Sequence, residues 1–238
     1  MTMPQAVILA GGLSTRLLPV TETIPKALVD INGNPFIYHQ LKLLKKNGIS
    51  KVLICAGHYG DQLEAYLKDG KEFGVLIEYS FDGEKLLGTA GAIRNAWQKI
   101  DDEFMLINGD SYLDIDYPAV YAAFKESGKM SLMTVIKNNN EWDKSNVEFS
   151  NGMVKRYDKK VQSRDMIYID YGLIIMKRAC FVETHCNASL HDGNYPIDMS
   201  VIYQDLISKG EMAGYEVKKR FYEIGSFKGL EETRALLK

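Results

Sequence analysis

The chain has 238 residues, of which 46% are apolar and 25% are charged, with only 6 prolines. This composition excludes a disordered, collagenous or coiled-coil chain, and it is sufficient to bury the core of a single domain over residues 1–238. Lys and Arg total 29 against 31 Asp and Glu, which gives a formal net charge of −2. We therefore expect no nucleic acid and no membrane among the partners, because no global positive field attracts either polyanion.

The sequence offers neither a membrane span nor a disulfide framework. The apolar run over residues 6–10 is far shorter than the roughly 18 residues needed to cross a bilayer, and no basic segment precedes it. Cys55, Cys180 and Cys186 are odd in number and form no CxxC pair, so we interpret them as unpaired thiols. Together these features favour a cytoplasmic protein.

Strands and helices alternate through the first half of the chain. Short β-branched and apolar runs predict strands over residues 7–10, 51–56, 76–79 and 104–108. Apolar residues at helical spacing predict helices over residues 35–47, 63–67 and 90–97. This alternation is typical of strands joined by helical crossovers, so we expect the α/β class with a mostly parallel central sheet flanked by helices.

The pattern changes after Asn108. Strand-like runs with few helices between them, which predict added antiparallel strands, cover residues 130–136, 147–149, 154–157 and 167–175. A helix over residues 199–208, a strand over residues 212–217 and a helix over residues 227–237 complete the chain.

Three further positions in this sequence have open interpretations. Asp114 and Asp116 continue an acidic stretch that we interpret as a surface loop. Trp142 lies in a polar stretch, where it either shields a cleft or covers a loop.

A glycine-rich loop directly follows the first predicted strand. Gly11 and Gly12 allow backbone amides to approach a phosphate, and Arg16 supplies a fork of donors. Neither the GxGxxG spacing nor the P-loop spacing is present. Because GxGxxG is the pattern of dinucleotide-binding folds, its absence makes a nicotinamide-binding oxidoreductase only a distant alternative. Two glycines alone are equally typical of a tight strand-to-helix turn. Lys26 behind Pro25, within reach of the same loop, favours a phosphate site.

The segment LAGGLSTRLLPVTETIPKAL, residues 9–28, resembles the N-terminal signature LAGGxGTRLxPxTxxxPKxL of the sugar-1-phosphate nucleotidyltransferases, also called nucleotide-sugar pyrophosphorylases. The resemblance covers essentially the whole chain and is greatest to the D-glycero-D-manno-heptose 1-phosphate guanylyltransferases. It implies a Rossmann-like, glycosyltransferase-A-like fold, with a nucleotide-binding part of about residues 1–115 and a sugar-phosphate-binding part of about residues 116–238. Ser14 stands where the family usually has a third glycine.

The resemblance assigns roles to the residues that match the family's motifs. It implies that Arg16, Lys26 and Asp110 are catalytic, with the two cations bound to the triphosphate. The segment LLGTAGA, residues 86–92, resembles the family's loop that lies against the nucleobase. The implied nucleotide-binding residues are Leu9, Gly11, Gly12, Ser14, Thr15, Gly88 and Thr89.

Two acidic residues are candidates for a metal site. Asp110 follows the strand predicted over residues 104–108, at the edge of the sheet where α/β folds bind ligands, and its carboxylate suits Mg²⁺. The family pairs this aspartate with a second one in a D-x-G stretch, and Glu223 occupies the matching place. The resemblance thus implies a Mg²⁺ cofactor held by Asp110 and Glu223. Without the resemblance, Asp110 is interpreted as a cap of the following turn and Glu223 as an exposed acid at a strand end.

The sugar side departs further from the family. Lys159 matches the lysine of the family's Glu-Lys-Pro motif and would bind the sugar 1-phosphate, although a basic cluster at this position is also typical of a solvated edge. Asn146 stands where many members have glycine, and Asp170-Tyr171-Gly172 replaces Asn-Ala-Gly. The implied sugar-phosphate-binding residues are Asn146, Lys159, Asp170 and Gly172.

The reaction implied is Mg²⁺-dependent transfer of a nucleotidyl group to a sugar 1-phosphate, giving a nucleotide sugar and pyrophosphate for capsule or lipopolysaccharide synthesis. GTP and D-glycero-D-manno-heptose 1-phosphate are the preferred substrates. The alternatives are a UTP-, CTP- or dTTP-dependent enzyme and a catalytically silent regulatory subunit that binds nucleotide sugar. The sequence leaves a homo-oligomer open.

Overall fold

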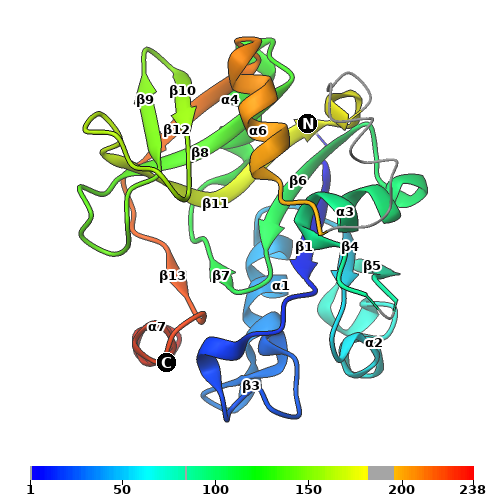
Figure 1. The fold of residues 1–238 in the computed structure, drawn as a ribbon. Coiled ribbons are helices and arrows are strands. Elements are labelled where there is room, and N and C mark those ends of the chain that lie inside the picture. Colours follow the sequence, from blue (N-terminus) through cyan, green and yellow to red (C-terminus); the bar gives the residue numbers. More distant parts are fainter. Residues whose placement is uncertain (1, 84, 182–195) are drawn as a thin grey trace.

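The structure is a computed structural model that describes residues 2–83, 85–181 and 196–238 (Figure 1). Within these residues one large sheet of nine strands runs through the molecule, in the order β5-β4-β1-β6-β11-β8-β12-β10-β9. Its strands are β1 (Gln5–Ala10), β4 (Lys51–Ala56), β5 (Leu76–Phe81), β6 (Glu103–Asn108), β8 (Ser131–Lys137), β9 (Val147–Ser150), β10 (Met153–Tyr157), β11 (Tyr168–Lys177) and β12 (Met212–Val217). The helices are α1 (Phe36–Lys46), α2 (Gly60–Leu67), α3 (Gly88–Asn95), α4 (Tyr117–Ser127), α6 (Ser200–Ser208) and α7 (Phe227–Leu236).

The sheet is mixed. Strands β5, β4, β1 and β6 pair in parallel, as expected for the first half of the chain. Strand β11 then runs antiparallel to both β6 and β8, whereas β12 is parallel to β8. The strands predicted in both halves are therefore confirmed, but the mostly parallel arrangement holds for the first half alone.

Helices cover both faces of the sheet, and the alternation of side chains along β1 shows why. Ala6 and Ile8 point into one hydrophobic cluster, which they share with α1, α2 and α4. Val7, between them, points into a second cluster that contains residues of α3 and α6. A strand with apolar residues on both sides needs cover on both faces of the sheet, and β1 lies between β4 and β6 in the interior of the sheet.

Asp114 and Asp116 lie in the loop before helix α4, as expected, but the helix itself was not predicted from the sequence. Asp116 is the N-cap of this helix, since its side chain accepts a hydrogen bond from the backbone N–H of Ala119 at 3.0 Å. Pro118 lies in the first turn, and Gly128 ends the helix with φ 65°. Asp114 forms an ion pair with Lys219. An aspartate cap, an early proline and a terminal glycine are a helix signature that was present in the sequence.

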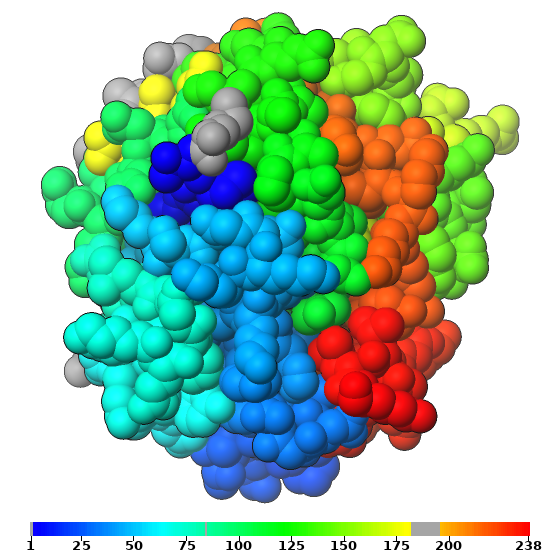
Figure 2. All heavy atoms as spheres, turned by 180° about the vertical axis from the view of Figure 1, so that it is seen from behind, coloured from blue at the N-terminus to red at the C-terminus, as the bar shows by residue number. Residues whose placement is uncertain are grey.

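The C-terminal helix α7 packs against the N-terminal part of the chain, as Figure 2 shows from behind, with the red segment beside the blue one. Ile224 and Leu230 share a small hydrophobic cluster with Val29, Ile31 and Phe36. This contact brings the segment before α7 to the edge of the sheet where β1 and β6 end.

Two simpler expectations concern cysteines and membranes. Cys55 and Cys180 are buried, whereas Cys186 lies outside the described residues. None of the helices in the described part of the chain combines the length and the apolar character that a membrane crossing requires.

Candidate active site

Two adjoining cavities open where β1 and β6 end. The small cavity has a volume of about 310 Å³, and the large cavity has a volume of about 660 Å³. Their linings share four residues, Leu9, Thr89, Asn108 and Asp110. Of the residues predicted to bind nucleotide, the small cavity is lined by Leu9, Gly11, Gly12, Ser14, Gly88 and Thr89, whereas Thr15 lines neither cavity.

The glycine-rich loop is compressed between the ends of two neighbouring strands. A Cβ atom built on Gly57, just after β4, would lie 2.6 Å from the carbonyl oxygen of Gly11. A Cβ atom on Gly109, just after β6, would lie 2.6 Å from the carbonyl oxygen of Leu9. Only glycine fits at these two positions, so the backbone after β4 and β6 approaches that of residues 9–11 closely from both sides.

Ser14 adopts the backbone conformation that explains the family's usual glycine. Its φ and ψ are 55° and 31°, in the left-handed region. A serine thus occupies a left-handed conformation that glycine adopts more readily. The side chain is half-buried in the lining of the small cavity, where its hydroxyl can reach a bound phosphate.

The predicted cation and acid meet at the boundary between the two cavities. Lys26 begins a short 3-10 turn after Pro25, and its Nζ atom lies 2.9 Å from Oδ2 of Asp110. Asp110 lines both cavities, and Lys26 lines the small one. A nucleotide in the small cavity and an acceptor in the large one would both approach this pair.

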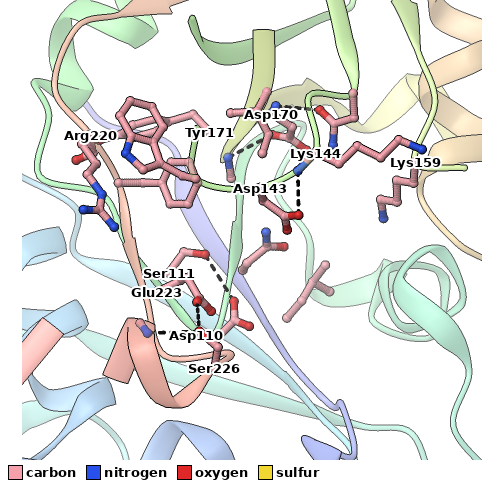
Figure 3. Close-up of a pocket in the computed structure, with 18 of the residues that line it drawn as sticks. Asp110, Ser111, Asp143, Lys144, Lys159, Asp170, Tyr171, Arg220, Glu223 and Ser226 are labelled. Atoms are coloured by element: carbon pink, nitrogen blue, oxygen red, sulfur yellow. Dashed lines mark hydrogen bonds between the residues drawn. The ribbon is translucent and has the colours of Figure 1, made fainter. Parts of the chain in front are cut away.

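Glu223 reaches the same place through a pair of two-residue strands. Strand β13 (Tyr222–Glu223) pairs antiparallel with β7 (Ser111–Tyr112), which sets Glu223 opposite Ser111. Figure 3 shows the side chains of Asp110, Ser111, Glu223 and Ser226 gathered at one end of the large cavity. A Cβ atom on Gly225 would touch the Glu223 carboxylate and lie 3.0 Å from Nη2 of Arg16 and 3.4 Å from Oδ2 of Asp110. Two carboxylates and an arginine thus converge on one point.

Glycines accommodate the extra methylene group of Glu223. Its carboxylate accepts hydrogen bonds from the backbone N–H of Gly225 and from the Ser226 hydroxyl, the latter at 2.8 Å. A Cβ atom on Gly229, in the first turn of α7, would collide with Oε1 of Glu223. These contacts hold the Glu223 carboxylate at the end of the large cavity.

This donor set fits Mg²⁺. The ion prefers hard oxygen ligands and usually takes only one or two carboxylates, with water and phosphate completing its coordination. Asp110 and Glu223 supply such a pair beside Arg16 and Lys26, which can bind the phosphates. No group of three or more metal-ligating side chains occurs among the described residues, so a cage made of protein ligands alone is not present there.

The residues predicted for the sugar phosphate all line the large cavity. The backbone N–H of Asp170 donates to Oδ1 of Asn146 at 3.0 Å, and the backbone N–H of Gly172 donates to Oδ1 of Asp170 at 2.9 Å. Burial raises the pKa of Asp170. Lys159 lies 3.2 Å from Oδ2 of Asp198, so its ammonium group is held at the cavity by a carboxylate from the segment before α6.

The loop at the start of α3 is fastened to that same segment. A Cβ atom on Gly88 would lie 2.6 Å from both the backbone nitrogen and the backbone oxygen of Ile197. The backbone N–H of Met199 donates to Oγ1 of Thr89 at 2.8 Å. Small residues at this position thus serve helix packing as well as the cavity.

Sequence reasoning missed Asp82, which lines the small cavity. Its Oδ2 atom accepts a hydrogen bond from the backbone N–H of Leu87 at 3.3 Å, and burial raises its pKa. Lys26, the cation of the small cavity, is paired with Asp110, and no ion pair involves Asp82 within the described ranges. The available signal was its place directly after β5, where carboxyl ends of strands bind ligands.

Comparisons with known proteins show the family of this chain. A model of the family described as nucleotidyl transferase matches residues 5–237. The chain is 32% identical to D-glycero-alpha-D-manno-heptose 1-phosphate guanylyltransferase from Campylobacter jejuni, over 71% of the chain and 72% of that protein. It is 33% identical to UTP–glucose-1-phosphate uridylyltransferase from Synechocystis, over 53% of the chain but only 36% of that protein.

A solved structure shares the fold. The crystal structure of HddC from Yersinia pseudotuberculosis, complexed with GMP-PN, superposes with a TM-score of 0.78 at 24% identity, covering 99% of the chain and 100% of HddC.

Proposed function

This chain belongs to the nucleotidyl transferase family, and from that premise we propose that it transfers a nucleotidyl group from a nucleoside triphosphate to a sugar 1-phosphate. The observation that carries the proposal is the pair Lys26 and Asp110, 2.9 Å apart where the small and large cavities meet. The nucleotide would occupy the small cavity beside the glycine-rich loop. The sugar phosphate would occupy the large cavity beside Lys159.

The reaction is an in-line displacement. An oxygen of the sugar phosphate forms a bond to the α-phosphorus while the bond from that phosphorus to the bridging oxygen breaks, and pyrophosphate leaves with the electron pair. No general base is needed, because the second pKa of a phosphate monoester is about 6 and the nucleophile is already ionised at neutral pH. Catalysis then depends on positioning and on charge stabilisation.

The chain's own residues supply most of this stabilisation. Lys26 would hold oxygens of the α-phosphate, and Arg16, which lines the large cavity close to Asp110, would bind the pyrophosphate that departs. Lys159 would orient the attacking phosphate. Mg²⁺ held by Asp110 and Glu223 supplies further positive charge when it is bound.

GTP is the triphosphate that the chemistry of the small cavity favours. Guanine presents two adjacent donors, N1–H and the N2 amino group, to one carboxylate, whereas no other base has two adjacent donors on its pairing edge. Asp82 is a carboxylate of this cavity without an ion pair among the described residues. The Campylobacter relative, by its name a guanylyltransferase of a heptose 1-phosphate, supports GTP and a heptose 1-phosphate as the substrates. The nucleotide sugar would serve capsule or lipopolysaccharide synthesis in the cytoplasm, where triphosphates are available.

The test is pyrophosphate release by the purified protein with Mg²⁺. GTP, CTP, UTP, ATP and dTTP are each combined with heptose, mannose and glucose 1-phosphates. We expect release with GTP and the heptose 1-phosphate. Release with another triphosphate would retain the reaction and reassign the base. Nucleotide binding without release under any combination would overturn the proposal in favour of a silent binding subunit.

A further inference from the structure

A loop that follows β8 presents three side chains of different chemistry to the large cavity. Trp142, Asp143 and Lys144 are consecutive, and all three line this cavity. Figure 3 shows Asp143 and Lys144 on the side of the cavity away from Glu223 and Ser226. The nucleotidyl transfer described above uses none of the three. We call residues 138–145 the tryptophan loop.

Buried polar side chains hold the tryptophan loop in one conformation. Asn138 is only 1% exposed and Ser145 is fully buried. The Asn138 amide donates to the carbonyl oxygen of Asp143 at 2.7 Å and to the Ser145 hydroxyl at 2.9 Å, and it accepts from the backbone N–H of Trp142 at 3.2 Å. Asn139 and Asn140 turn the chain with φ values of 46° and 63°. A polar network satisfied in this way fixes a unique geometry, so the side chains at its tip are preorganised.

The indole ring is also fixed from outside the loop. The guanidinium carbon of Arg220 lies 5.7 Å from the Trp142 ring centroid, and Phe221 contacts the ring edge-on at 6.3 Å. Arg220 is itself held by an ion pair with Glu232. A half-buried indole that lines a polar cavity offers an electron-rich face to the polarised C–H groups of a sugar ring.

Two carboxylates of the large cavity can accept from hydroxyl groups. Asp143 and Asp170 both line the large cavity, and neither forms an ion pair with any residue in the described parts of the chain. A sugar that carries its own carboxylate would meet like charge here, whereas a neutral sugar would donate hydroxyl hydrogens to both acids.

We propose that the tryptophan loop recognises the sugar of the acceptor, with Trp142 packed against a C–H face of a neutral, polyhydroxylated ring and Asp143 accepting from its hydroxyl groups. The inference rests on the proposed function and adds the acceptor's class, because it selects neutral sugar phosphates over sugars that bear a carboxylate. Asn138 and Ser145 are positioning residues that act through the loop.

The two tryptophans of the chain permit a test that requires no turnover. The chain contains only Trp97 and Trp142, and Trp97 lines neither cavity of the site. In a Trp97→Phe protein the indole emission therefore reports on Trp142. We expect mannose 1-phosphate or the heptose 1-phosphate to change this emission in a saturable manner, whereas inorganic phosphate and glucuronic acid 1-phosphate leave it unchanged.

A kinetic measurement complements the emission. With GTP as the donor, Trp142→Ala and Asp143→Asn should each raise KM for the sugar phosphate about tenfold while KM for GTP stays unchanged. Glu141→Ala is the matched control, since Glu141 is exposed in the same loop and lines neither cavity. Ser145→Ala should raise the same KM, and Ser145→Thr, which keeps the hydroxyl, should restore part of it.

The outcomes separate this inference from the proposed function. Saturable emission changes without pyrophosphate release would retain the sugar site and remove the reaction. Pyrophosphate release with unchanged sugar-phosphate KM in Trp142→Ala and Asp143→Asn would retain the reaction and overturn the sugar-recognition role of the loop. Unchanged emission with every neutral sugar phosphate would also overturn it.

Discussion

The backbone N–H of Ile224 donates to the carbonyl oxygen of Asp110 over 2.9 Å. This bond ties the two acidic segments of the candidate metal site together through the main chain. Neither carboxylate takes part in it. Each acid can therefore be changed without removing the contact that holds the segments in place.

Removing either member of the central pair should abolish most of the turnover. We expect Lys26→Ala and Asp110→Asn each to lower pyrophosphate release about a hundredfold to a thousandfold, because each removes a charged group beside the reacting phosphates. Thermal unfolding should show that both variants remain folded. Lys51→Ala breaks an exposed ion pair with Asp101 and is the control. Near-normal turnover in a variant would remove that residue from the mechanism.

Gly229 should prove essential for the placement of Glu223. An added methyl group in Gly229→Ala collides with the Glu223 carboxylate, so we expect a loss of about 1–3 kcal/mol in the free energy of unfolding together with reduced turnover. Denaturant titration and pyrophosphate release measure the two effects. Glu231→Ala, at an exposed position of the same helix, should change stability by less than about 0.5 kcal/mol. Unaltered stability and turnover in Gly229→Ala would mean that Glu223 does not occupy this position in the working protein.

Asp82→Asn should weaken the preference for GTP. The amide keeps one acceptor and replaces the other with a donor, so we expect the ratio of kcat/KM for GTP over UTP to fall by the equivalent of about 1–3 kcal/mol. Pyrophosphate release with each triphosphate provides the ratio, and Asp61→Asn on the exposed surface of α2 is the control. An unchanged ratio would show that Asp82 does not read the base.

Asp170→Asn should change how the stability of the protein depends on pH. Burial raises the pKa of Asp170 above its ordinary value of 3.8, so the folded protein binds this proton more tightly than the unfolded chain does. The free energy of unfolding therefore falls as pH rises from 3.8 through the raised pKa. The variant lacks this loss, and its amide oxygen can still accept from Gly172. We expect it to be more thermostable than the wild type at neutral pH, with no advantage in acid.

Asp158→Asn is the control for that experiment because its pKa is shifted in the opposite direction. The backbone N–H groups of Val161 and Lys160 hold the pKa of Asp158 below its ordinary value. The stability that Asp158 contributes is present above that ordinary value and is lost as pH falls through the lowered pKa. Thermal unfolding across the pH range should thus give differences of opposite sign for the two variants. An advantage of Asp170→Asn that does not grow with pH would contradict the assignment.

The predictable part of this protein is the part that depends on local pattern. The strands of the sheet were visible as apolar runs, and the loop at Gly11 together with Lys26 was visible as a motif. Helix α4 also had local signals in the sequence, since Asp116, Pro118 and Gly128 mark its ends. It was missed because the acidic stretch before it was interpreted as a loop and drew attention away from these signals.

The rest of the site depends on contacts between distant segments. Trp142 lines the large cavity together with Arg220 and Phe221, which pack against it from a distant segment of the chain. Asp82 acquires its surroundings from the end of β5 and the start of α3. The spacing of residues in the sequence does not predict such contacts between distant segments. The roles assigned to Thr15, Arg16 and Lys159 by resemblance likewise stay predictions, although the structure brings Arg16 and Lys159 to the large cavity.

The junction between Gly88 and Ile197 joins the two halves of the site. The backbone N–H of Ala90 donates to the carbonyl oxygen of Ile197 at 2.8 Å, and one residue later Asp198 holds Lys159. A sugar phosphate that draws Lys159 away from Asp198 would therefore pull on the loop beside the nucleotide. We expect the affinities of the two substrates to be thermodynamically coupled, so that each bound substrate changes the affinity for the other by the same factor.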